Sequence, residues 1–94
     1  MMVSFLLHGN FITGDIPKEF GNLTSLVWLD LRNNRLIGEI TFSLGNLKKL
    51  KFLELSRNNL TGTIPESLAN ISSLNEIMLD SNNLTGQIPH KLFD

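Results

Sequence analysis

Residues 50–66 read LKFLELSRNNLTGTIPE, and residues 74–90 repeat their pattern as LNEIMLDSNNLTGQIPH, beginning 24 residues later. The same period runs through the whole chain without insertion or deletion, and it aligns columns of leucine or isoleucine, of asparagine and of glycine. Such self-similarity indicates equal supersecondary units that stack on one another. The sequence therefore predicts a single domain over 1–94, built of four coils at about 2–25, 26–49, 50–73 and 74–94.

Each coil contains a short stretch that is typical of a half-buried strand. In Leu26-x-x-Leu29-x-Leu31 the leucines alternate with other residues, so one face is apolar. One strand of this length cannot bury its leucines alone, but stacked coils give them a continuous interior. We therefore expect a solenoid of the α/β class with a short parallel sheet on its concave side.

Asparagine recurs just after each of these strands, at Asn10, Asn34, Asn58 and Asn82. An amide side chain has both donors and an acceptor, so it can satisfy buried backbone groups of its own coil and of the next. The column predicts an internal asparagine ladder. The glycine column (Gly14, Gly38, Gly62 and Gly86) predicts backbone with a positive φ or a close approach between coils.

The outer side of each coil is marked by proline. Pro17, Pro65 and Pro89 share one column, and Thr41 holds the fourth place, where it should loosen one coil slightly. Proline suits an extended segment that has no ladder partner at its nitrogen. The residues that follow, such as Pro65-Glu66-Ser67-Leu68-Ala69, predict a 3₁₀ turn or a short irregular helix on the convex side.

Composition argues against several functions. A net charge of -1 offers no basic stripe for nucleic acid or for an anionic membrane. The chain has no cysteine, and its two histidines, His8 and His90, lie too far apart along the stack to share a metal. We therefore expect neither metal nor cofactor. We also expect no enzyme activity, because Asp30 and Glu54 should be solvated on an open sheet, without the enclosed pocket that acid/base catalysis requires. Phe5-Leu6-Leu7 lacks the flanks of a signal peptide, and no stretch is long enough for a membrane helix.

The residues between the inward leucines should form the concave surface, where a partner would bind. The candidates for this surface are Leu6, His8, Trp28, Asp30, Arg32, Phe52, Glu54, Arg57, Glu76, Met78 and Asp80. Its apolar members, Leu6, Trp28, Phe52 and Met78, suggest either a binding stripe or ordinary packing between strands. Its slightly acidic charge suggests either a partner with basic or amide groups or salt bridges between strands.

The quoted stretches resemble the plant-type leucine-rich repeat, LxxLxLxxNxLxGxIPxxL, over the whole chain. With GNLTSLVWLDL at 21–31 and SLGNLKKLKFLEL at 43–55, the chain is similar to ectodomains of plant receptor-like kinases of the somatic embryogenesis receptor kinase group. The resemblance implies a leucine-rich repeat solenoid that binds a peptide, a protein or another receptor ectodomain in signalling. It also implies a place on the outer face of the plasma membrane or in the cell wall.

Three further expectations follow. Sequons at Asn22, Asn59, Asn70 and Asn83 predict N-glycosylation if the protein is secreted. No cysteine-bearing cap is expected at either end, so leucines of the end coils should face water and favour self-association. Two alternatives to the receptor function stay open: an inhibitor resembling the polygalacturonase-inhibiting proteins of plant walls, and a truncated fragment without independent function.

Overall fold

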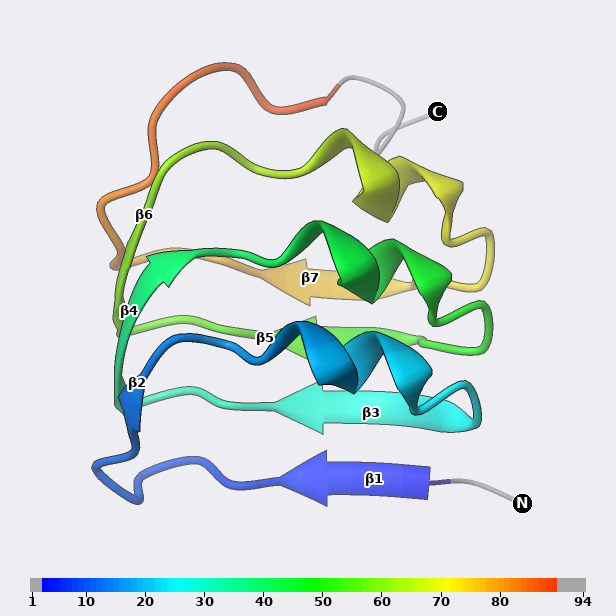
Figure 1. Cartoon of the computed structure of the whole chain (residues 1–94), viewed down its shortest axis with the longest axis horizontal. Coiled ribbons are helices and arrows are strands. Elements are labelled where there is room, and N and C mark those ends of the chain that lie inside the picture. Colours follow the sequence, from blue (N-terminus) through cyan, green and yellow to red (C-terminus); the bar gives the residue numbers. More distant parts are fainter. Residues whose placement is uncertain (1–2, 90–94) are drawn as a thin grey trace.

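A computed structural model describes residues 3–89, and it shows coils stacked side by side as the period predicts (Figure 1). Each of the first three coils runs through a strand, crosses to the outer side and returns through a 3₁₀ helix. The strands of the main sheet are β1 (Val3–Leu6), β3 (Leu26–Asp30), β5 (Phe52–Glu54) and β7 (Glu76–Met78). The 3₁₀ helices are η1 (Lys18–Asn22), η2 (Phe42–Asn46) and η3 (Glu66–Asn70). His90 and Leu92 lie outside the described residues.

The main sheet is parallel throughout, in the order β1-β3-β5-β7. Its register matches the period of the sequence, because Leu29 pairs with Leu53 and Leu53 pairs with Ile77. Residues 24 apart therefore lie directly beside one another. The predicted parallel sheet is confirmed, and the outward side chains form straight rows across the strands.

A second parallel sheet, which we did not expect, runs along the flank where the chain leaves the asparagines. Its strands are β2 (Thr13–Gly14), β4 (Arg35–Glu39) and β6 (Asn59–Thr61), in that order. Leu36 and Leu60 point inward, while Arg35, Ile37 and Asn59 are exposed. A single inward leucine, as in β4 and β6, is too short a signal for a strand, and β2 has no inward leucine at all. Only stacking on the next coil supplies the ladder partners.

The convex side carries 3₁₀ helices, as predicted. The backbone at Thr41 (φ -66, ψ 134) matches that at Pro17 (φ -63, ψ 136), so the expected loosening of this coil is not found. Successive helices pack closely: a Cβ on Gly45 would lie 2.5 Å from Cβ of Ser67, whose hydroxyl donates to the carbonyl of Phe42. Glycine at this place lets η2 lie against η3.

The interior is a column of aliphatic side chains between the main sheet and the helices. The completely buried members are Leu26, Leu29, Leu44, Leu47, Leu50, Leu53, Leu55, Leu60 and Leu68. Coils at the middle of the stack are covered on both sides, whereas Phe5 on β1 is 36% exposed and stacks on Phe20 of η1. Among residues 3–89, no helix is both long and apolar enough to cross a bilayer.

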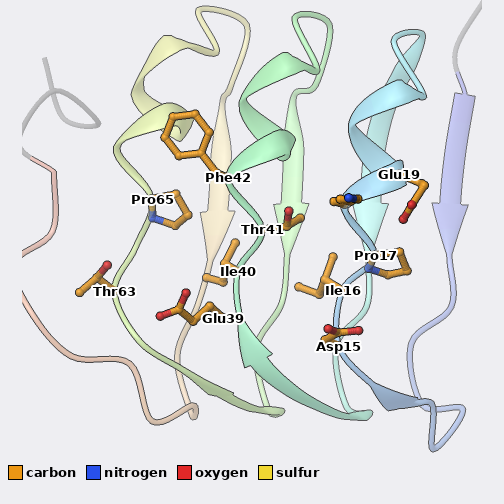
Figure 2. A pocket seen from close by; sticks show the side chains of 11 residues that line it. Asp15, Ile16, Pro17, Glu19, Glu39, Ile40, Thr41, Phe42, Thr63 and Pro65 are labelled. Atoms are coloured by element: carbon orange, nitrogen blue, oxygen red, sulfur yellow. The ribbon is translucent and has the colours of Figure 1, made fainter.

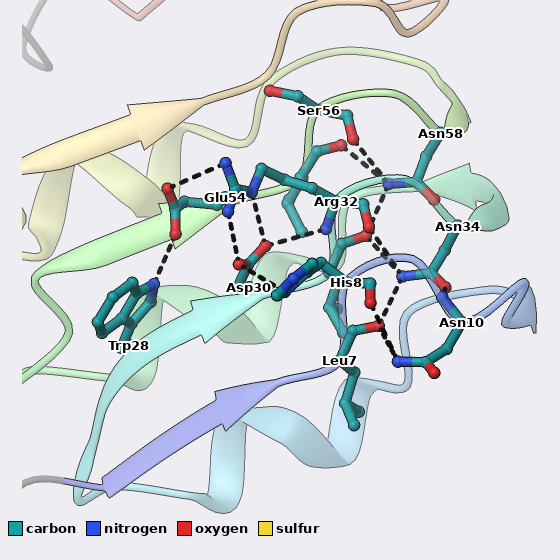
Figure 3. Close-up of polar contacts among 12 residues, drawn as sticks. Leu7, His8, Asn10, Trp28, Asp30, Arg32, Asn34, Glu54, Ser56 and Asn58 are labelled. Carbon is teal, nitrogen blue, oxygen red and sulfur yellow. Dashed lines mark hydrogen bonds and ion pairs between the residues drawn. The ribbon is translucent and has the colours of Figure 1, made fainter.

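The asparagine ladder connects neighbouring coils (Figure 3). The amide of Asn58 donates to the carbonyls of Leu31 and Leu55, both at 3.0 Å, and its Oδ1 accepts from the backbone N–H of Leu36. The carbonyl of Leu31 also accepts from Asn34, and that of Leu55 also accepts from Asn82. Each shared carbonyl thus receives amide donors from two successive coils, which fixes the spacing of the stack.

Candidate functional site

The register of the main sheet arranges the outward side chains in rows. One row is Ser4, Trp28, Phe52 and Glu76, and the next is Leu6, Asp30, Glu54 and Met78. The segments that follow the strands also lie side by side, because the N–H of Asn33 donates to the carbonyl of Ser56 and the N–H of Arg57 donates to the carbonyl of Asp80. The residues proposed from sequence for the concave face are therefore brought together on one surface.

The four apolar residues of this surface do not share one row. Trp28 and Phe52 are direct neighbours, half-buried, with ring centroids 5.3 Å apart and planes tilted by 52°. Leu6, which is 47% exposed, and the half-buried Met78 stand in the next row at its two ends. The apolar part of the surface is therefore a central aromatic pair with two diagonal neighbours, and packing between strands accounts for the pair's own contact.

The carboxylates at the centre of the surface are buried, contrary to the expectation that an open sheet would leave them solvated. Asp30 is 2% exposed and Glu54 is 5% exposed. Arg32 covers Asp30 with a two-pronged contact, since its Nε and one terminal nitrogen each lie 2.9 Å from a carboxylate oxygen. Trp28 covers Glu54 and donates its indole N–H to it (Figure 3).

Two weaker contacts extend this cluster between strands. Nδ1 of His8 lies 3.3 Å from Asp30, and a terminal nitrogen of Arg32 lies 3.9 Å from Glu54. The salt bridges between strands, one of the two alternatives for the surface charge, are therefore present. We call His8, Trp28, Asp30, Arg32 and Glu54 the concave cluster.

The concave cluster keeps the carboxylate of Asp30 charged. Burial alone would raise the pKa of Asp30, but hydrogen bonds from Arg32 and the nearby charges of Arg32 and His8 outweigh it and lower this pKa below its usual value. The Asp30 hydrogen bond in turn raises the pKa of Arg32. At neutral pH the cluster therefore holds the ionised Asp30 against the guanidinium of Arg32, with Glu54 beside them and His8 at the exposed edge.

Farther along the surface, Asp80 accepts a hydrogen bond of 2.6 Å from the hydroxyl of Ser56. This hydrogen bond is the main cause of the lowered pKa of Asp80. Arg57 and Ser81 next to them have φ near +60°, as does Asn33, so the chain turns sharply at this column. The surface thus ends in a rim of exposed polar side chains.

The arrangement is suited to recognition. Both buried carboxylates are already engaged by Arg32 or Trp28, so neither is free to act as a base. In the described part of the chain, no group of three or more His, Asp or Glu side chains could hold a metal ion. The asparagines of the sequons, at 22, 59, 70 and 83, are all exposed, and none lies on the main sheet. Their glycosylation stays a prediction.

Known families match nearly the whole chain. The family model described as leucine-rich repeats, in two copies, matches residues 24–70, which is half of the chain. The model described as leucine-rich repeat matches residues 2–23 and 73–94. Among curated proteins, none matches the chain.

Several solved structures of plant receptors have the same fold. The BIR3–SERK2 complex of Arabidopsis thaliana has a TM-score of 0.90 at 39% identity, and the match covers 93% of this chain and 47% of that one. The plant peptide hormone receptor RGFR1 in complex with RGF2 has a TM-score of 0.92 at 47% identity, covering 95% and 14%.

The receptor kinase GASSHO1/SCHENGEN3 of Arabidopsis thaliana, in complex with CASPARIAN STRIP INTEGRITY FACTOR 2, matches in its ectodomain. The TM-score is 0.91 at 43% identity, and the match covers 95% of this chain and 11% of that one. The resemblance to plant-type leucine-rich repeat ectodomains is thereby confirmed. This chain spans less than half of each of these structures.

Proposed function

This chain belongs to the leucine-rich repeat family, and from that premise we propose that its concave face binds a peptide or protein ligand as part of a plant receptor-like kinase or receptor-like protein. The binding takes place outside the cell, on the plasma membrane or in the wall. The partner is a peptide or a second receptor ectodomain. Structural neighbours described as receptor complexes with peptides or with another ectodomain support this proposal.

The concave cluster beside Trp28 and Phe52 is the observation that carries the proposal. Aromatic and arginine side chains in a rigid setting are the usual components of binding hot spots. Trp28 is held by its ring contact with Phe52 and its hydrogen bond to Glu54, and Arg32 is held by Asp30. Because these side chains are ordered before a ligand arrives, binding loses less conformational entropy.

The dimensions of the surface fit an extended peptide. Adjacent strands are about 4.8 Å apart, so the four strands of the main sheet span about 14 Å, the length of four or five extended residues. A ligand that runs along these rows crosses Trp28 and Phe52 on neighbouring strands, while Asp30 and Glu54 stay covered by Arg32 and Trp28. The exposed carboxylates of Glu76 and Asp80 favour a ligand with basic or amide groups near its end.

A binding panel tests the proposal. Secreted plant peptides and receptor ectodomains are presented to the immobilised chain, and the affinity of each is measured by biolayer interferometry. We expect at least one member to bind, and the double variant Trp28→Ala/Phe52→Ala to weaken it by tenfold or more, as loss of two hot-spot residues should. Ile37→Ala is the matched control, because Ile37 is an exposed apolar residue of β4, away from the main sheet.

Circular dichroism should be the same for the wild type and both variants. Undiminished binding by the double variant would remove the aromatic pair from the site. Absence of binding to every panel member would contradict the receptor function itself.

A further inference from the structure

Two hollows open on the outer side of the solenoid, away from the main sheet. The first has a volume of about 750 Å³ and lies where β2 and β4 lead into η1 and η2, between Asp15, Glu39 and Phe42 (Figure 2). The second, of about 590 Å³, is lined by Glu66 and Ile88 among others. Both hollows are lined by Phe42, Thr63 and Pro65, so they join into a single groove that the Phe42 ring divides.

Phe42 breaks the pattern of its column. In the neighbouring coils the same position, the first residue of the 3₁₀ helix, is occupied by Lys18 and Glu66. Phe42 is 70% exposed and does not contribute to the core. The backbone before it is the same as in the other coils, so the fold does not require an aromatic residue here. An exposed aromatic residue beside a hollow is typical of an anchor for a partner.

The groove is acidic. Asp15, Glu19 and Glu39 line the first hollow together with a single base, Lys18, and Glu66 lines the second. Within residues 3–89, no salt bridge joins any of these carboxylates to a basic side chain. Their charges are therefore available to a cation from outside the chain.

We propose that this groove is a second docking site, which takes a basic segment of a partner protein. An arginine or lysine of the segment places its charged end between Asp15 and Glu39, and its alkyl stem crosses the ring of Phe42. The carboxylates hold the charged end by charge-assisted hydrogen bonds, and the apolar stem packs against the aromatic ring. An apolar residue next to it in the segment packs against Pro65. The chain can then hold one partner on its concave face and a second on this groove.

Selection of peptides tests the site without knowledge of the natural partner. A phage-displayed library of random dodecapeptides is selected on the wild-type chain, and the affinities of the enriched peptides are measured by titration. We expect enrichment of arginine or lysine next to an apolar residue. Affinity should fall by about tenfold or more in Phe42→Glu. Glu66 occupies this position in the next coil, so the fold accommodates the change.

Two further variants serve as controls. One tests whether binding depends on the charge of the groove, and the other tests whether the peptides bind to the concave face instead. Asp15→Asn/Glu39→Gln keeps the size of both side chains and should weaken the peptides several-fold at low salt, with a smaller loss at high salt. Trp28→Ala/Phe52→Ala should leave their affinity unchanged. Selected peptides that lack basic residues, or that bind Phe42→Glu as tightly as the wild type, would overturn the proposal. So would peptides whose binding is lost only in the concave-face variant.

Discussion

Replacement of Asn58 by alanine should show how much the asparagine ladder contributes to stability. The side chain is 6% exposed, and its two amide protons and its oxygen are all used. Asn58→Ala loses the bond accepted from Leu36, the two short bonds donated to Leu31 and Leu55, and a longer one of 3.3 Å to the carbonyl of Ser56. The three shorter bonds contribute about 1 kcal/mol each. The carbonyls of Leu31 and Leu55 keep their second amide donors, so the loss should stay near 3 kcal/mol.

A loss of that size is large for this chain. At 94 residues its whole free energy of unfolding is expected to be about 5–14 kcal/mol. The free energy is measured by urea unfolding at low temperature, followed by far-ultraviolet circular dichroism, and the slope with urea should be the same as in the wild type.

Asn10→Ala is the matched control from the same column. The amide of Asn10 is exposed and donates only to the carbonyls of Leu7 and His8 in its own coil, where water can replace it. This variant should lose less than about 1 kcal/mol. Equal losses in Asn10→Ala and Asn58→Ala would refute the view that the shared amides hold successive coils together.

Two other perturbations follow from the structure. Because the pKa of Asp30 is lowered in the folded chain, its charge stabilises the fold above the ordinary value of 3.8, and this contribution is lost as the pH falls below it. Asp30→Asn should therefore reduce the stability of the fold at pH 7. It should also make the stability fall less steeply as the pH is lowered from about 4 to 2, as measured by thermal unfolding across that range. If stability fell as steeply with acid in Asp30→Asn as in the wild type, the stabilising role of the Asp30 charge would be disproved. Gly45→Ala should reduce the free energy of unfolding by about 2 kcal/mol or more, because its Cβ would lie 2.5 Å from that of Ser67. Gly14→Ala should reduce it by only about 1 kcal/mol, because a Cβ there has no atom within 4 Å and only the φ of +86° is unfavourable. Urea unfolding compares the two, and a larger loss in Gly14→Ala would contradict the close packing of η2 against η3.

The 24-residue period by itself determined most of the fold. It places each residue next to its equivalents in the coils before and after, so the inward leucines, the Asn58 ladder and the concave rows all follow from spacing. The 3₁₀ turns after the proline column were predicted correctly for the same reason. The flanking sheet was missed, because β4 and β6 each have only a single inward leucine to mark them and β2 has none, and their ladder comes from stacking.

Spacing indicates which side chains point outward, but it does not determine which of them become covered. Asp30 and Glu54 were expected in water and are buried, because Arg32 folds back over one and the indole of Trp28 reaches across to the other. The groove beside Phe42 likewise exists only where segments of neighbouring coils meet. Long side chains reach beyond their own row, so their burial depends on rotamers and on contacts between strands, which only the tertiary structure decides.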